Sequence, residues 1–247
     1  MNDFIAIEDR PRLEQHGLAD FEALWGLELT PVDDPNVDRG GTSHVCRLEL
    51  DGHAYYLKRQ QNHLTRNLAH PFGEPTFARE FRNIQRYQQR GVPALQATFY
   101  AQRHQHGTWR ALLLTRALTG WRDLDHAFAH AREEERPALL VACGHLARRL
   151  HAAGLVHGCF YPRHIFTRAT ATEIEACLID LEKTRPLWFG RRDRIKDVEQ
   201  FIRHAPALKD AEIRCLLVAY LDCPPDSPEI NLWQHALAAR RQKKAGA

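Results

Sequence analysis

The sequence lacks the patterns that would assign it at once to several common classes of protein. Its six cysteines form no CxxC pair, and their spacing fits neither a zinc site nor a compact disulfide scaffold. We therefore expect reduced thiols in a cytoplasmic protein. The chain also has no uninterrupted run of about 18 to 20 apolar residues, the length that spans a membrane. Any contact with a membrane is consequently expected to be peripheral.

An excess of charge of one sign is missing as well. The 34 basic and 31 acidic residues leave a net charge of +3 when the histidines are neutral. This charge alone is too small to indicate a nucleic-acid-binding protein, and we expect no nucleic-acid partner. The first residues are acidic where a signal peptide needs basic residues followed by an apolar run, so we expect no export by that route. What is present is a chain of 247 residues, 44% of them hydrophobic, which suffices for one large domain or two closely joined lobes.

The first half of the chain has the pattern of a β-sheet with one helix. Five strands are predicted, at 36–38, 45–50, 53–58, 97–102 and 109–115. The dipeptide Asp51-Gly52 favours a type I′ hairpin between the second and third of them. Aromatic and aliphatic residues at helical spacing predict a helix over 77–90, which ends at Gly91.

The second half is mainly helical. Apolar periodicity predicts helices at 133–153, 197–204, 211–221 and 233–241, with short apolar runs at 155–156, 165–166 and 177–179. A β-rich half followed by a helical half indicates an α+β fold with two lobes. We place an N-terminal lobe at 1–117 and a C-terminal lobe at 118–247, with a hinge near 116–119.

Four features follow one another in the order found in a protein-kinase-like phosphotransferase. They are Lys58 at the end of an early strand, Glu80 on the next helix, the loop 157–164, and Asp180 after an apolar run. A phosphate chain needs a cation on its oxygens, a carboxylate that holds this cation, and an acidic ligand for the bridging metal ion. Taken singly, these residues are equally typical of a surface lysine, a solvated glutamate and a turn aspartate.

Together these features resemble the lipopolysaccharide core kinases of the Kdo kinase and heptose kinase group, most closely the InaA-type branch. The resemblance extends from the turn at 39–42 to the Lys196-Asp197 pair. Its pieces are Tyr56-Leu57-Lys58, the helix at 79–86 running into Gly91-Val92-Pro93, His157-Gly158-Cys159 with His164, and Leu178-Ile179-Asp180-Leu181. Each piece is weakly specific by itself, and the resemblance depends on their order and spacing.

The resemblance implies a bilobal protein-kinase-like fold with a nucleotide-binding N-terminal lobe. It also implies phosphorylation of a sugar hydroxyl in lipopolysaccharide core, or of another anionic sugar acceptor, with ATP and Mg²⁺ as cofactors. The location implied is the cytoplasm, peripheral on the inner-membrane face. Nothing in the composition or spacing identifies a particular sugar or hydroxyl.

The resemblance also assigns roles to single residues. Lys58 would contact the nucleotide phosphates and Glu80 would pair with it. Asp180 occupies the position of the metal-binding aspartate of the DFG motif, although Leu181-Glu182 follows it in place of Phe-Gly. His164 stands where protein kinases have a metal-binding asparagine, and it would either bind the metal ion or only hydrogen-bond within its loop.

A glycine-rich turn is a further candidate for phosphate binding. Gly40, Gly41 and Thr42 could cover the phosphates, but the pattern lacks GxGxxG and is equally typical of a plain hairpin turn. Asp197 has the position of the kinase carboxylate that braces the catalytic loop. It is equally typical of an acidic residue at the start of a helix.

Cys159 stands where kinases, including the heptose kinases, have the aspartate that accepts or positions the proton of the acceptor hydroxyl. A positioned base contributes roughly 10² to 10⁴ in rate, whereas phosphoryl transfer depends mainly on positioning and charge neutralisation. We therefore treat Cys159, His157 and Asp180 as candidate catalytic residues of an active kinase. A thiol acts as a base only where its neighbours favour the thiolate, and His157 and Arg163 are the candidates near it in sequence.

Two other interpretations stay open. In one, Cys159 only packs, and the protein is a pseudokinase that binds a partner or regulates it. In the other, the protein is a small-molecule kinase of the aminoglycoside or choline type, although these normally keep the aspartate that is missing here.

A basic segment follows Asp180. It has six cations, Lys183, Arg185, Arg191, Arg192, Arg194 and Lys196, against Glu182 and Asp193. Such a run is either a solvated face or a segment that receives an anionic acceptor or an anionic membrane surface. Trp188 and Phe189 within it could stack on a sugar or enter a membrane interface.

Overall fold

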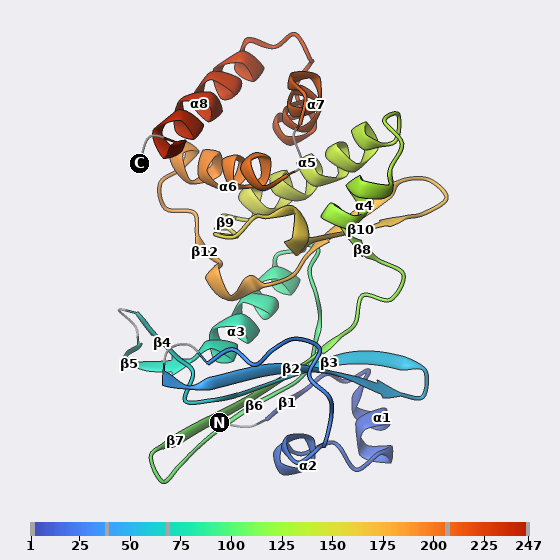
Figure 1. Cartoon of the computed structure of the whole chain (residues 1–247), viewed down its shortest axis with the longest axis vertical. Coiled ribbons are helices and arrows are strands. Elements are labelled where there is room, and N and C mark those ends of the chain that lie inside the picture. Colours follow the sequence, from blue (N-terminus) through green and yellow to red (C-terminus); the bar gives the residue numbers. More distant parts are fainter. Residues whose placement is uncertain (1–2, 38–39, 68–69, 206–207, 246–247) are drawn as a thin grey trace. The chain divides into compact units, whose positions relative to one another are not determined.

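The computed structural model describes residues 3–37, 40–67, 70–205 and 208–245. The chain forms two compact units (Figure 1). The first unit comprises Met1–Arg86 and Leu95–Thr119, and the second comprises Tyr87–Ala94 and Gly120–Ala247. The expected α+β class is confirmed, because the first unit is rich in strands and the second in helices.

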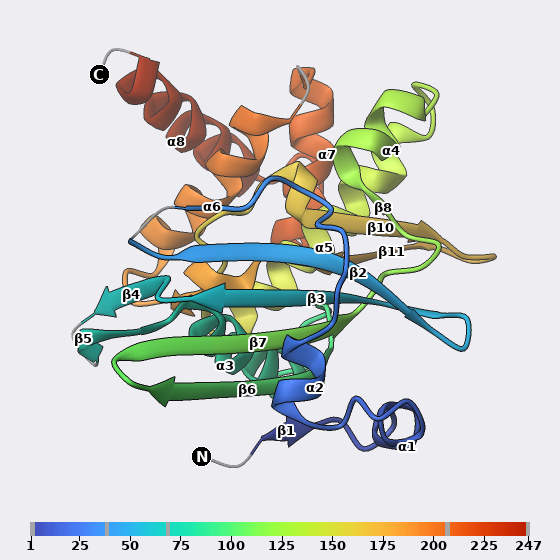
Figure 2. The same ribbon diagram turned by 60° about the horizontal axis from the view of Figure 1, so that its bottom comes forward.

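The first unit is built on a five-stranded antiparallel sheet (Figure 2). Its strands, in spatial order, are β1 (Phe4–Ile5), β6 (Ala97–Gln105), β7 (Thr108–Arg116), β3 (His53–Gln61) and β2 (Thr42–Leu50). Asp51 and Gly52 join β2 to β3 with φ angles of 50° and 76°. Two positive φ angles are what a type I′ turn requires, so the predicted hairpin is confirmed.

One strand of the sheet differs from the sequence-based prediction. The run at 36–38 was expected to pair in the sheet, but Asn36 makes only an isolated bridge to Ser43, and residue 38 lies outside the described residues. The sheet is completed by β1, where Phe4 lies opposite Tyr100. A two-residue strand has too little alternation to be recognised from sequence.

Helices cover both faces of this sheet. Two short helices, α1 (Arg10–Gln15) and α2 (Phe21–Trp25), cover one face of the sheet. Their buried side chains form a hydrophobic core with the strand side chains that point to this face, among them Leu57. The hairpin of β4 (Leu64–Asn67) and β5 (His70–Pro75) leads into α3 (Thr76–Gln89), which was predicted at 77–90. Because side chains alternate along a strand, Lys58 points to the face opposite Leu57, which is the face that α3 covers.

A buried carboxylate ties the N-terminal segment to the sheet. Asp9 is 2% exposed and accepts hydrogen bonds from Tyr55 Oη at 3.1 Å, Thr98 Oγ1 at 2.9 Å and Arg116 Nε at 2.9 Å. The three donors lie on three different strands of the sheet. Asp9 therefore connects strands that are far apart in the sequence.

We expect Asp9→Ala to lower the free energy of unfolding by about 2 to 4 kcal/mol, because it leaves the buried hydroxyls of Tyr55 and Thr98 without their acceptor and removes the partner of the partly exposed Arg116. Urea unfolding followed by circular dichroism measures this loss. Asp3→Ala is the matched control, since the Asp3–Arg103 ion pair is partly exposed and should contribute at most about 1 kcal/mol. Equal losses in the two variants would contradict the assignment.

The second unit consists of five helices and short strands. The helices are α4 (Leu124–His130), α5 (Arg136–Ala152), α6 (Arg191–His204), α7 (Asp210–Leu221) and α8 (Pro228–Ala245). One small sheet has the order β11 (Ile174–Leu178), β10 (Ile165–Ala169), β8 (Arg122–Asp123), and β12 (Arg185–Pro186) pairs with β9 (Leu155–Val156). Gly144 lets α5 approach α7 closely, since a Cβ there would lie 2.7 Å from the carbonyl oxygen of Leu216.

All six cysteines are free thiols. Among the described residues, no helix combines the length and the apolar character needed to cross a bilayer.

Candidate active site

The first unit contributes an ion pair. Lys58 Nζ lies 2.6 Å from Glu80 Oε1, and the two side chains are 19% and 5% exposed. Lys58 is held in the middle of the sheet, with Val45 of β2 on one side and Leu113 of β7 on the other. Glu80 lies on the buried face of α3 with Phe77 and Phe81, which explains why an acidic residue of an amphipathic helix is not solvated.

The glycine turn has a packing role. A Cβ on Gly41 would lie 2.3 Å from backbone atoms of Gln61 and Asn62, so only glycine fits against the end of β3. Gly40 has a φ of +74° and no neighbour within 4 Å of a Cβ, and Thr42 begins β2 opposite Gln61. The close approach explains Gly41 without a ligand, and a role of Gly40 and Thr42 in covering phosphates stays a prediction.

In the second unit, the loop after β9 is braced from α6. The backbone N–H groups of His157 and Gly158 donate to the two carboxylate oxygens of Asp197, at 2.7 and 3.1 Å. Asp197 is 1% exposed and lies within α6, which begins at Arg191. The helix-start interpretation of Asp197 is therefore wrong, and its carboxylate braces the loop at 157–164.

His157 has both ring nitrogens engaged. Its Nε2 donates to the carbonyl oxygen of Ile179 at 2.9 Å, and its Nδ1 accepts from the backbone N–H of Cys159 at 3.3 Å. Burial lowers the pKa of His157, so the ring is the neutral tautomer that these two bonds require. With no free nitrogen, His157 is suited to positioning the loop rather than to accepting a proton.

Asp180 is held in an unusual backbone conformation. Its φ of 57° and ψ of 60° lie in the left-handed region, which aspartate tolerates better than most residues. Ile179 before it is fixed on both sides, because its N–H donates to the His164 carbonyl and its own carbonyl accepts from His157. Such strain persists only where the surrounding structure determines it and is common at functional sites.

The His164 ring lies beside Asp180. Its Nδ1 lies 3.0 Å from the carbonyl oxygen of Cys159, which can only accept, so Nδ1 carries the proton. Its Nε2 accepts from Arg163 Nε at 3.3 Å and lies 3.5 Å from Asp180 Oδ2. A hydrogen bond from the other ring nitrogen to a backbone carbonyl is the arrangement that orients a metal-binding imidazole.

The side chains of Asp180 and His164 suit a divalent metal ion that takes most of its ligands from water and substrate. Among the described residues, no group of three or more His, Cys, Asp or Glu side chains could hold a metal. Asp180 and His164 alone would leave the remaining positions to phosphate oxygens and water, which is how Mg²⁺ is usually bound. The imidazole nitrogen also suits a softer ion such as Mn²⁺.

Cys159 contacts partners that sequence proximity does not indicate. The thiol is 3% exposed and hydrogen-bonds the side chains of Lys183 and Tyr161. The proximity of Cys159 raises the pKa of the Lys183 ammonium. Arg163 and His157 were the expected neighbours of the thiol. Instead, Arg163 contacts the His164 ring and His157 contacts only the Cys159 backbone.

Lys183 reaches the thiol because two chain segments pack closely. A Cβ on Gly158 would lie 2.8 Å from the carbonyl oxygen of Lys183, so a larger residue would push the 3₁₀ turn Leu181–Lys183 away from the loop. No sequence pattern indicates this contact beyond the presence of Lys183 in the basic segment. The structure thus brings Cys159, His157, His164 and Asp180 together in the second unit.

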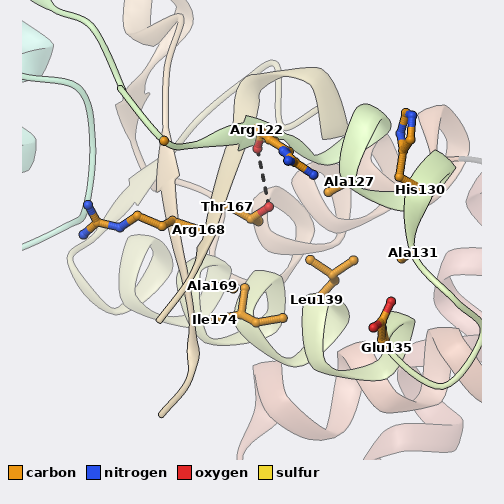
Figure 3. A pocket seen from close by; sticks show the side chains of 11 residues that line it. Arg122, Ala127, His130, Ala131, Glu135, Leu139, Thr167, Arg168, Ala169 and Ile174 are labelled. Atoms are coloured by element: carbon orange, nitrogen blue, oxygen red, sulfur yellow. Dashed lines mark hydrogen bonds between the residues drawn. The ribbon is translucent and has the colours of Figure 1, made fainter. Parts of the chain in front are cut away.

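A pocket of about 490 Å³ lies elsewhere in the second unit, between α4, α5 and β10 (Figure 3). Arg122, His130 and Glu135 are its polar side chains near Leu139, and the Arg122 carbonyl accepts a hydrogen bond from Thr167. None of the candidate site residues lines this pocket. The pocket is therefore separate from the loop at 157–164.

The geometry agrees with comparisons to known proteins. The model of the lipopolysaccharide kinase (Kdo/WaaP) family matches residues 22–220, a span that includes every candidate site residue. The chain belongs to the lipopolysaccharide kinase (Kdo/WaaP) family. This membership places it among the kinases and confirms the resemblance found in the sequence.

Two relatives support the assignment. This chain is 32% identical to Protein InaA of Escherichia coli (strain K12) over 197 residues, which are 76% of this chain and 90% of InaA. It is also similar to the solved structure of WaaP in complex with acyl carrier protein, with a TM-score of 0.73 and 22% identity. That similarity covers 100% of this chain and 98% of WaaP, and it confirms the kinase-like fold.

Proposed function

We propose that this protein transfers the γ-phosphoryl group of ATP to a sugar hydroxyl of lipopolysaccharide core. The observation that carries the proposal is the ion pair between Lys58 and Glu80, at 2.6 Å. A strand lysine held by a carboxylate of the following helix is the group that binds nucleotide phosphates in protein kinases. The sugar acceptor is taken from the family, since no contact in the structure selects a particular hydroxyl.

Each candidate residue has a distinct task in this proposal. Lys58 neutralises phosphate oxygens, and Glu80 keeps its ammonium in place. Asp180 and His164 hold a divalent ion, which supplies charge neutralisation on the phosphates. Asp197 and His157 fix the loop and the start of the Asp180 turn, so that these ligands need not reorganise when ATP binds.

Cys159 favours a second candidate function, a pseudokinase. The thiol is buried, and its contacts with Lys183 and Tyr161 are those that a cysteine with only a packing role would also make. A pseudokinase would bind ATP through the same residues without transferring phosphate. Under the kinase proposal, the acceptor oxygen loses its proton to Cys159 or to water as the O–P bond forms and ADP leaves.

Binding of Mg-ATP tests what both functions share. At ATP concentrations a hundredfold above Kd, we expect a stabilisation of about 2.7 kcal/mol against thermal unfolding. Lys58→Met should remove most of it, because the phosphates lose their cation. Lys209→Met is the matched control, since Lys209 pairs with Glu133 on the surface. The absence of any Mg-ATP stabilisation in the wild type would overturn the kinase and the ATP-binding pseudokinase, and would leave only a pseudokinase that binds no nucleotide.

Transfer to an acceptor separates the kinase candidates. Phosphate transfer to core oligosaccharide, with none to small alcohols such as choline, supports the proposed substrate class. The opposite preference would assign the protein to the small-molecule kinases.

A further inference from the structure

A loop joins β12 to α6 (Figure 1). Two adjacent aromatic side chains are exposed in it. Trp188 is 67% exposed and Phe189 is 62% exposed. We call residues 187–192 the aromatic tip. Single exposed apolar residues are common, but two large neighbouring ones indicate a surface that meets something other than water.

A buried carboxylate holds this tip in shape. Asp193 is 4% exposed and accepts the backbone N–H groups of both Trp188 and Phe189, each at 3.1 Å. Arg185 donates to the same carboxylate from both terminal nitrogens, at 2.8 and 2.6 Å, and its guanidinium lies 5.4 Å from the centre of the Trp188 ring. The exposed rings are therefore presented by a fixed backbone, and the clamp stays ionised because Arg185 lowers the pKa of Asp193 to about 2.

The charge around the tip is positive on the surface. Arg191, Arg192 and Arg194 are exposed, whereas Asp193 and Asp197 are buried and already hydrogen-bonded. The near balance of charges over the whole chain thus hides a local excess of exposed cations at the start of α6.

Beside the tip, α6 and α8 form a groove of about 730 Å³. Three arginines line it, Arg191, Arg192 and Arg240, and its lining includes no acidic residue. Arg240 Nε also lies 3.5 Å from Oε2 of the buried Glu199. Guanidinium groups that line one hollow are suited to a phosphate group.

We propose that the aromatic tip and this groove dock on an anionic phospholipid bilayer. Trp188 and Phe189 enter the headgroup boundary, where amphipathic rings are enriched. Arg191 and Arg192 bind the lipid phosphates, with Arg240 as a third contact. Apolar burial combined with attraction to anionic lipids is how peripheral proteins bind membranes.

The tip is connected to the loop that carries Cys159. Arg185 and Pro186 of β12 pair with Val156 and Leu155 of β9, and the catalytic loop begins directly after β9. A docked tip would thus bring a lipid-anchored acceptor to this loop, a consequence that rests on the proposed function. Docking itself does not require the protein to be a kinase.

Vesicle sedimentation of the full chain without ATP tests the docking. We expect binding to vesicles of phosphatidylethanolamine with 30% phosphatidylglycerol and little binding to pure phosphatidylcholine. Arg191→Glu/Arg192→Glu should weaken binding by about fivefold or more for each arginine. Trp188→Ala/Phe189→Ala should weaken it by at least about tenfold, and should abolish quenching of tryptophan fluorescence by brominated lipid.

Matched variants control for charge and for exposed aromatics. Arg122→Glu/Arg149→Glu removes the same charge from exposed positions of the same unit, and Phe72→Ala removes another exposed aromatic ring. Both should bind like the wild type. The proposal would be overturned if the control variants weakened binding equally or if loss of the two rings left binding unchanged. It would also be overturned if an acidic protein captured this protein and vesicles did not. A protein that binds vesicles but transfers no phosphate would fail as a kinase and still support docking.

Discussion

Replacing Asp180 with asparagine is expected to lower phosphoryl transfer from ATP by about 10²- to 10³-fold. The change removes the carboxylate that lies 3.5 Å from His164 Nε2. A divalent ion then loses its charged protein ligand, and the phosphates lose neutralisation. Transfer of labelled γ-phosphate over a range of Mg²⁺ and Mn²⁺ concentrations measures the effect.

Asparagine is the informative substitution because the fold tolerates it. Asparagine adopts the left-handed conformation of residue 180 as readily as aspartate, so the turn should form unchanged. Asp222→Asn is the matched control, since Asp222 has a φ of 54° and lies in the same unit, at the end of α7. Undiminished transfer by Asp180→Asn would show that Asp180 is not a metal ligand.

Cys159→Asp is expected to raise phosphoryl transfer by about 10²-fold, the lower end of what a positioned base contributes. The new carboxylate would stand where kinases have their catalytic aspartate. Burial of a charge at a side chain that is 3% exposed would be costly, but Lys183 and Tyr161 are already there to hydrogen-bond it. Initial rates with core oligosaccharide at saturating Mg-ATP measure the gain.

Cys159→Asn separates charge from shape. It has the size of aspartate without a base, and should show no gain. If Cys159→Asp also shows none while Cys159→Ala loses the wild-type activity, the thiol itself is the base. Equal gains in the aspartate and asparagine variants would contradict a role of residue 159 in proton transfer.

The sequence predicted those parts of the fold that depend on local patterns. Alternation and the Asp51-Gly52 turn predicted the β2–β3 hairpin, and apolar spacing predicted α3 to within a residue. Helical spacing did not reveal the start of α6, because its first turns are rich in arginine and carry few apolar residues. Asp197 was therefore placed at a helix start, although it lies inside a helix and braces a loop.

The candidate site was predictable where order along the chain determines it. Lys58 and Glu80 pair because a strand and the next helix pack together. The contact of Cys159 with Lys183 was not predictable, because it depends on the close approach at Gly158. Likewise, the clamp of Asp193 on Trp188 and Phe189 depends on a turn geometry that composition does not encode.

The most direct test of the central claim is transfer of labelled γ-phosphate from ATP to purified lipopolysaccharide core by the wild-type protein. The account predicts labelled core that requires a divalent ion and is lost in Lys58→Met. Binding of Mg-ATP without any label in the core would contradict the kinase function and leave a pseudokinase.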